Sequence, residues 1–237
     1  MARQPRVSYA GAMYHVTSRG NNGGEIFLDY ADFERFHSLL GRYRERHDFR
    51  LYAYALIPNH VHLLIETTES SSISQIMHGI NTAYAMYFNG RHNRSGHVFQ
   101  GRFRSSIIDS ENYFLEVMRY IDLNAVRAGL AKDPSRYRWS SCRHWAGGEA
   151  DELLDGHELY ECLGETAQER RHAYRGLLRD RLEGGSERPQ PELSYSVFMG
   201  GEDFESRMTR IYGRSIWVRY RRLLDELHEL RRAALPE

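Results

Sequence analysis

The sequence predicts an α+β fold: an antiparallel sheet with helices on one face, followed by a helical C-terminal extension. Strand-like and helix-like segments alternate over residues 12–128 in the order β-α-β-β-α-β-α. This is the order of a ferredoxin-like split βαβ sandwich with one more helix, which would leave the second sheet face open for a site. The chain of 237 residues is 41% hydrophobic and 27% charged, as expected of a globular protein with a buried core.

The strands are predicted from side-chain alternation and from the turn signals beside them. Residues 12–18 alternate and are rich in aromatic and β-branched types, which favour strands. Segments 49–57 and 60–67 are separated only by Pro58-Asn59, a sharp turn signal, so we expect an antiparallel hairpin. A fourth strand is expected at 103–109.

The helices are predicted from apolar residues at helical spacing. Asp29 or Asp32 can cap the first helix, in which Phe and Leu residues recur on one face. A second helix fits residues 72–89, with one stripe of Ile, Met, Tyr and Phe. The third is expected to run from Ser110 to Ala128 and to end at the following glycine.

The pattern weakens after about residue 150, so we divide the chain into residues 1–146 and an accessory region, 147–237. Residues 158–182 and 202–233 are helical in pattern. The segment near 183–194 between them is rich in Gly, Pro, Ser and Glu, which is typical of a linker.

Composition excludes several classes of protein. No apolar stretch is long enough for a membrane helix, and the N-terminus lacks the apolar segment of a signal peptide, so we expect a cytoplasmic protein. Cys142 and Cys162 are the only cysteines and form no C-x-x-C pair. Neither a disulfide scaffold nor a zinc knuckle is expected.

Formal net charge is zero, but the positive charges are clustered. Of the 32 basic residues 31 are arginine, whose planar guanidinium suits phosphate and stacks on bases. Residues 91–104 contain four arginines and no acid, and residues 207–222 contain six with no acid, interleaved with aromatic residues. A zero total therefore hides two basic segments.

Two histidines, His60 and His62, lie one residue apart in the expected strand 60–67. Side chains alternate along a strand, so both imidazoles share one face, with Cα atoms roughly 7 Å apart. This spacing suits two ligands of one metal ion. A pair of hydrogen-bonded histidines lining the sheet is the alternative.

The third helix places Tyr113, Tyr120 and Asn124 together on a flank of its apolar stripe. An amide oxygen of Asn124 could complete a His, His, Asn set for Mg²⁺ or Mn²⁺, beside a tyrosine that attacks a phosphate. Helix geometry does not choose between the two tyrosines. Packing within the core is the ordinary role of such residues.

Five segments, taken together, carry a more specific signal. Over about residues 5–146 the chain resembles the REP-associated tyrosine transposases, a branch of the HUH endonuclease superfamily. The motifs are YHVTSRGNN (14–22), PNHVHLL (58–64), GHVFQGRFRS (96–105), RYIDLNAVRAGL (119–130) and WSS (139–141).

This resemblance implies a metal-dependent catalytic domain that cleaves and rejoins single-stranded DNA beside palindromic hairpins through a 5′-phosphotyrosine intermediate. It assigns His60, His62 and Asn124 as ligands of Mg²⁺ or Mn²⁺, and Tyr120 rather than Tyr113 as nucleophile. Two departures remove no chemical group: Ala125 stands where the family usually has proline, and Ile57 where it often has methionine. A continuous helix is therefore expected at residue 125.

Several arginines and aromatic residues are candidates for DNA contacts. The N-terminal arginines, the basic loop and the C-terminal basic helix supply them: Arg3, Arg6, Arg19, Arg91, Arg94, Phe99, Arg102, Phe103, Arg104, Arg214, Trp217 and Arg221. The two phenylalanines are expected to stack on bases. The alternatives are a disordered tail for Arg3 and Arg6, a solvated loop for the middle group and a salt-bridged surface helix for the last.

Two other functions remain open from the sequence. Another HUH nickase, such as a replication initiator or relaxase, would use the same chemistry, although no helicase segment is recognisable. A domesticated, non-catalytic hairpin-binding protein or repressor would bind without cutting. The oligomeric state, monomer or dimer, stays open as well.

Overall fold

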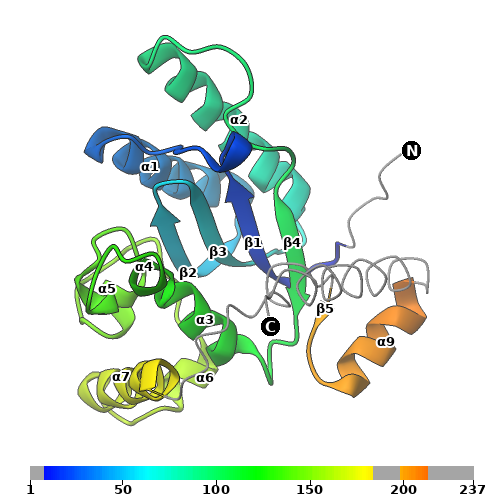
Figure 1. Cartoon of the computed structure of the whole chain (residues 1–237). Coiled ribbons are helices and arrows are strands. Elements are labelled where there is room, and N and C mark those ends of the chain that lie inside the picture. The colour runs from blue at the N-terminus through cyan, green and yellow to red at the C-terminus, as the bar shows by residue number, and fades with distance from the viewer. Residues whose placement is uncertain (1–7, 184–197, 213–237) are drawn as a thin grey trace, which may run out of the picture.

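A five-stranded sheet in the order β2-β3-β1-β4-β5 organises the computed structural model, which describes residues 8–183 and 198–212 (Figure 1). Its strands are β1 (Met13–Arg19), β2 (Arg50–Ile57), β3 (His60–Glu66), β4 (Arg104–Ile108) and β5 (Phe198–Met199). The first four pair antiparallel, as the split βαβ order requires, so the predicted α+β fold is confirmed. The two-residue β5, which sequence alternation did not predict, adds a parallel edge beside β4.

Two helices, α1 (Tyr30–His47) and α2 (Ile73–Arg91), cover one face of the sheet (Figure 1). Asp29 caps α1 by accepting hydrogen bonds from the backbone N–H groups of the next helical turn. Ser72 and Gln75 form a reciprocal capping box at the start of α2. Between helices and sheet lies one hydrophobic core.

The opposite face is not open, as the sequence had suggested, but largely covered by a second core. Its helical segments are α3 (Phe114–Asp122), α4 (Asn124–Arg127), α5 (Cys142–Trp145), α6 (Glu158–Glu161) and α7 (Ala167–Glu183), with the 3₁₀ turn η2 (Pro134–Arg136). A further 3₁₀ turn, η1 (Asn21–Gly23), follows β1, and α9 (Glu202–Tyr212) follows β5. None of the described helices is long and apolar enough to cross a membrane.

The single helix expected from Ser110 to Ala128 is two helices that meet at Leu123. The carbonyl of Tyr120 accepts hydrogen bonds from the side chains of Asn124 (2.7 Å) and Arg127 (3.1 Å). A side chain thus satisfies a carbonyl of the last α3 turn, and this explains why the helix breaks although Ala125 could continue it. Gly129, at φ +71°, ends the segment as predicted.

Packing continues across residue 146, so the two regions expected from the sequence do not have separate cores. Tyr160, Tyr174 and Leu178 pack in the same core as α3. The Asp155 carboxylate accepts from Arg44 of α1 at 2.6 Å and from the backbone N–H of Leu51 at 2.9 Å. The division at residue 146 stays a prediction about function. The expected linker and the end of the 202–233 helix lie largely outside the described residues.

Candidate active site

The register of the sheet brings polar side chains from three strands into two adjacent rows. Thr17 of β1 pairs with His62 of β3 on one side and with Arg104 of β4 on the other. In the next row Arg19 is opposite His60. Directly paired residues of antiparallel strands project from the same face, so all five lie on the face toward α3.

Both histidines of this pair use their Nδ1 atoms in hydrogen bonds within the protein. His60 Nδ1 lies 2.6 Å from Asn59 Oδ1, and His62 Nδ1 lies 3.0 Å from His15 Nε2. The ring of His15 also stacks on that of His62, with centroids 5.2 Å apart. Each Nε2 atom of the pair therefore remains for another ligand.

The environment of the pair favours neutral imidazoles. Burial, and then the charge of Arg19, lowers the pKa of His60 to about 4. Burial, reinforced by neighbouring His60 and His15, holds the pKa of His62 well below its ordinary value. A neutral ring keeps the nitrogen lone pair that metal coordination requires.

Tyr120, rather than Tyr113, lies beside the histidines. Its ring centroid is 5.6 Å from that of His62 and 5.6 Å from that of His15, with the rings edge to face. Tyr113 instead precedes the first turn of α3 and packs against the second core. The structure therefore separates two tyrosines that helical spacing had placed on one flank.

The guanidinium of Arg127, which the sequence analysis did not single out, lies 4.9 Å from the centroid of the Tyr120 ring. It also donates a hydrogen bond to the Tyr120 carbonyl. Seven residues separate the two, about two helical turns, so the helix period alone would have placed them on one face. A fixed cation thus lies beside the candidate nucleophile.

Asn124 is oriented by hydrogen bonds that leave its oxygen available. Its Nδ2 donates to the carbonyls of Tyr120 (2.7 Å) and Ile121 (3.3 Å). Because only the NH₂ group can donate to two carbonyls, this network assigns the amide and turns Oδ1 the other way. The side chain is 8% exposed.

These residues meet in a cavity of about 560 Å³. The cavity is lined by Thr17, Arg19, Asn59, His60, His62, Gln100, Gly101, Arg102, Arg104, Tyr120 and Asn124. Three arginines and no acidic residue belong to this lining, so the cavity suits an anion such as phosphate.

The donor set also fits a divalent cation. Two imidazole Nε2 atoms and one amide oxygen are borderline and hard ligands of the kind that Mg²⁺ and Mn²⁺ accept, with room for water and a phosphate oxygen. In the described part of the chain, no group of three or more His, Cys, Asp or Glu side chains gathers as a metal site. A third protein ligand would therefore have to be of another kind, and the sequence had proposed the amide oxygen of Asn124.

Two phenylalanines expected to stack on DNA bases are core residues. Phe99 is 9% exposed and Phe103 is 6% exposed, and both pack in the core beneath α1 and α2. The backbone around them does position the site, because Phe99 bridges to Gly20 and Gln100 N–H donates to the Arg19 carbonyl. The expectation of base stacking is therefore wrong for the structure as it stands.

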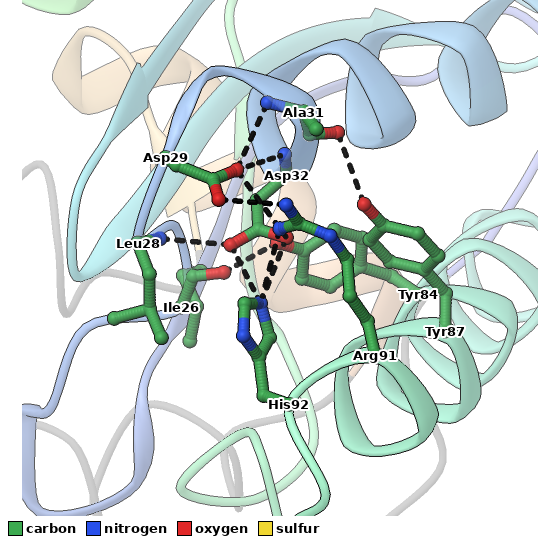
Figure 2. Close-up of polar contacts among 9 residues, drawn as sticks. All are labelled: Ile26, Leu28, Asp29, Ala31, Asp32, Tyr84, Tyr87, Arg91 and His92. Atoms are coloured by element: carbon green, nitrogen blue, oxygen red, sulfur yellow. Dashed lines mark hydrogen bonds and ion pairs between the residues drawn. The ribbon is translucent and has the colours of Figure 1, made fainter.

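Arg91, expected to contact DNA, forms ion pairs at the end of α2 (Figure 2). Its guanidinium lies 2.7 Å from carboxylate oxygens of both Asp29 and Asp32, and His92 Nε2 lies 3.0 Å from the fully buried Asp32. Figure 2 shows these side chains converging between α1 and α2. Arg91 thus ties the two helices together.

The other candidate DNA contacts fall into two groups. Arg19, Arg102 and Arg104 line the cavity, and Arg94 is exposed with its guanidinium 5.4 Å from the Phe88 ring centroid. The remaining candidates lie outside the described residues: Arg3, Arg6, Arg214, Trp217 and Arg221.

Comparisons with known proteins identify a matching family and a similar fold. Residues 8–124 match the model of a family described as IS200-like transposases. The chain is similar in fold to a REP-associated tyrosine transposase bound to a REP hairpin, with 18% identity and a TM-score of 0.53, over 66% of this chain and 93% of that one.

A putative transposase from Deinococcus radiodurans is more weakly similar, at 15% identity and a TM-score of 0.36 over 51% of this chain and 96% of that one. No curated protein matches the chain. Through residues 8–124, the chain belongs to the family of IS200-like transposases.

Proposed function

We propose that the protein is a metal-dependent endonuclease and strand transferase that acts on single-stranded DNA beside palindromic hairpins. Membership of a transposase family supports DNA cleavage and transfer in general. The observation that carries the finer proposal is the convergence of Tyr120, His60, His62 and Asn124 on one arginine-lined cavity.

In the proposed reaction the Tyr120 hydroxyl oxygen attacks the scissile phosphorus. The bond from phosphorus to the 3′ oxygen breaks, the phenol loses its proton, and the departing 3′ oxygen gains one to leave as a hydroxyl. DNA then carries its 5′ phosphate on Tyr120. Arg19 and Arg102, which line the cavity, would bind the phosphate oxygens and hold them in line with the attack.

His60, His62 and Asn124 would hold the divalent cation. When bound, Mg²⁺ or Mn²⁺ supplies charge neutralisation at the phosphate as it is attacked. Rejoining reverses the first step: a 3′ hydroxyl attacks the phosphotyrosine, a new phosphodiester forms, and Tyr120 leaves as a phenol. No external energy source is needed, because the phosphotyrosine keeps the energy of the broken phosphodiester bond.

The DNA partner is proposed by analogy with the similar structure, which is of a transposase bound to a REP hairpin. The cavity itself supports a single strand, because the phosphorus must approach a tyrosine that is only 8% exposed. A duplex would have to open before such an approach. Hairpin stems next to single strands provide this junction.

Incubation with a hairpin-bearing oligonucleotide and Mn²⁺ tests the proposal. The wild-type protein and Tyr113→Phe should form a covalent protein–DNA adduct, and Tyr120→Phe should bind without forming one. Adducts should disappear when Mn²⁺ is omitted and a chelator is added. Binding without cleavage by the wild type would favour a hairpin-binding repressor, whereas cleavage independent of a hairpin would favour another type of HUH nickase.

A further inference from the structure

A second cavity, of about 490 Å³, lies between η2, the end of α5 and α7. It is a groove with four basic residues in its lining, Lys132, Arg136, Arg175 and Arg179, and two acidic ones, Asp133 and Glu149. None of the residues that line this groove also lines the cavity that contains Tyr120, which is called the active cavity below. The groove is therefore a separate basic surface feature.

Both acids of the groove are already engaged by other groups. Glu149 pairs with Arg143 outside the groove lining. Asp133 accepts hydrogen bonds from the N–H and the hydroxyl of Ser135, at 2.9 Å and 2.8 Å, as the cap of η2. Arg143 neutralises Glu149, whereas the hydrogen bonds from Ser135 leave the charge of Asp133 in place. The lining therefore keeps a net positive charge.

The four basic side chains form no ion pair within residues 8–183 and 198–212. Arg175 Nε donates to the Ala146 carbonyl at 2.6 Å. Arginines elsewhere are commonly paired, for example Arg44 with Asp155 and Arg181 with Glu116. Among the described residues the groove thus keeps an excess of positive charge, and such a surface suits an anionic partner.

The groove is connected to the active cavity by a short length of chain. Asn124 lines the active cavity and Lys132 lines the groove. Helical rise over α4 and extended chain after it set an upper limit of about 20 Å between their Cα atoms. This span corresponds to about six base steps of a strand at ~3.4 Å each.

We propose that this groove binds the sugar–phosphate backbone of the substrate DNA a few nucleotides away from the active cavity. The inference rests on the proposed function for the identity of the anion. The contacts would be to phosphates, which together with sugars receive half to two-thirds of the hydrogen bonds in protein–DNA complexes and carry no sequence information. The groove would thus add affinity and hold the register of the strand, and it would add no sequence preference.

Binding measured without chemistry tests the groove. In a Tyr120→Phe background, the groove variant Arg136→Gln/Arg179→Gln is compared with Arg42→Gln/Arg46→Gln, two exposed arginines on α1 at the other sheet face. Dissociation constants are measured against salt for single-stranded oligonucleotides that extend from two to twelve nucleotides beyond the hairpin on either side. Thermal unfolding of each variant verifies the fold.

The groove variant should lower the slope of log Kd against log salt by about 1.4 to 1.8, since each of the two lost phosphate contacts removes roughly 0.7–0.9. This decrease in slope should appear only with oligonucleotides whose single strand, on one side of the hairpin, is long enough to reach the groove. The variant Arg136→Lys/Arg179→Lys should keep most of the wild-type slope. The α1 variant should behave as the background does.

An unchanged slope at every length would overturn the groove proposal. Equal weakening for the shortest and longest oligonucleotides would overturn it as well, because the residues would then act on the fold or the active cavity. The proposed function is tested by a different result: it would be wrong if the wild type formed no covalent adduct, whatever the salt slopes of the groove variant.

Discussion

The Nε2 atom of His15 lies 3.0 Å from the Nδ1 atom of His62, inside a stack of two nearly parallel imidazoles. Of two ring nitrogens in a hydrogen bond, one donates and the other accepts. When His62 Nδ1 donates, its Nε2 keeps the lone pair that a cation needs. With His15 as the acceptor, this hydrogen bond fixes the tautomer and the ring orientation of His62 that cation binding requires.

Replacing His15 by phenylalanine tests this relationship. The ring contacts to His62 and Tyr120 remain, but the hydrogen-bond partner of His62 is lost. We expect the half-saturating Mn²⁺ concentration for adduct formation to rise about 10- to 100-fold, the usual cost of losing such a partner. His172→Phe, on the exposed surface of α7, should leave it unchanged. An unaltered Mn²⁺ requirement in His15→Phe would show that His62 needs no orienting partner.

Because the helix breaks at Leu123, we predict that proline is tolerated at residue 125. Residue 125 lies in the first turn of α4, where a missing N–H is tolerated. Ala125→Pro should therefore change the free energy of unfolding by less than about 1 kcal/mol, within the range of ordinary substitutions. Ala83→Pro, the same change inside α2, should cost about 3 kcal/mol or more.

Urea unfolding of the two proline variants provides the measurement. A large loss in Ala125→Pro, similar to that in Ala83→Pro, would mean that the helix runs unbroken through Leu123. Adduct formation by Ala125→Pro should also stay near the wild-type rate, because the hydrogen bonds of Asn124 come from its side chain.

The sequence predicted much of the fold because its strands and helices carry strong local signals. Alternation marked β1 and β3, and the Asp29 and Ser72 caps lie where the apolar stripes of α1 and α2 begin. The break at Leu123 was missed because it depends on the side chain of Asn124, which propensity does not weigh. The strand β5 was missed because two residues are too few for alternation to be seen.

A site residue could be predicted where its role follows from local geometry, and could not where its role depends on partners that are distant in the sequence. His60 and His62 share a face through local geometry alone, so their pairing could be predicted. The partners of His15 and Arg91 could not be predicted, since they lie 47 or more residues away. Phe99 and Phe103 were misassigned for a similar reason: a basic loop suggests exposure, whereas their rings fill the core.

The burial of Phe99 and Phe103 predicts how their replacement affects stability and binding. Truncation of either to alanine should lower the free energy of unfolding by about 3–5 kcal/mol, the range for a buried phenylalanine. Arg102→Gln, in the exposed loop between them, should change stability little and weaken DNA binding. If Phe99→Ala or Phe103→Ala keeps wild-type stability but loses affinity, the ring must leave the core to stack on a base.

The buried carboxylate of Asp122 connects the helix of Tyr120 to α7, beyond the matched family region. It accepts from Ser141 Oγ at 2.6 Å and from the Tyr174 hydroxyl at 2.8 Å, and burial raises its pKa to about 7. Asp122 is the second residue after Tyr120, so these hydrogen bonds hold the segment that carries the proposed nucleophile.

Tyr174→Phe removes one of these donors while its ring continues to fill the core. Above about pH 8, where the Asp122 carboxyl is ionised, the free energy of unfolding should fall by about 1.5–3 kcal/mol, the usual contribution of a hydrogen bond to a charged group. Tyr87→Phe serves as the control, because its hydroxyl donates to the Ala31 carbonyl near the surface at 3.2 Å. That loss should stay below about 1.5 kcal/mol, the upper end for a neutral hydrogen bond. Equal losses in urea unfolding would show that Asp122 does not depend on α7, and α7 would then contribute to the active site only through packing.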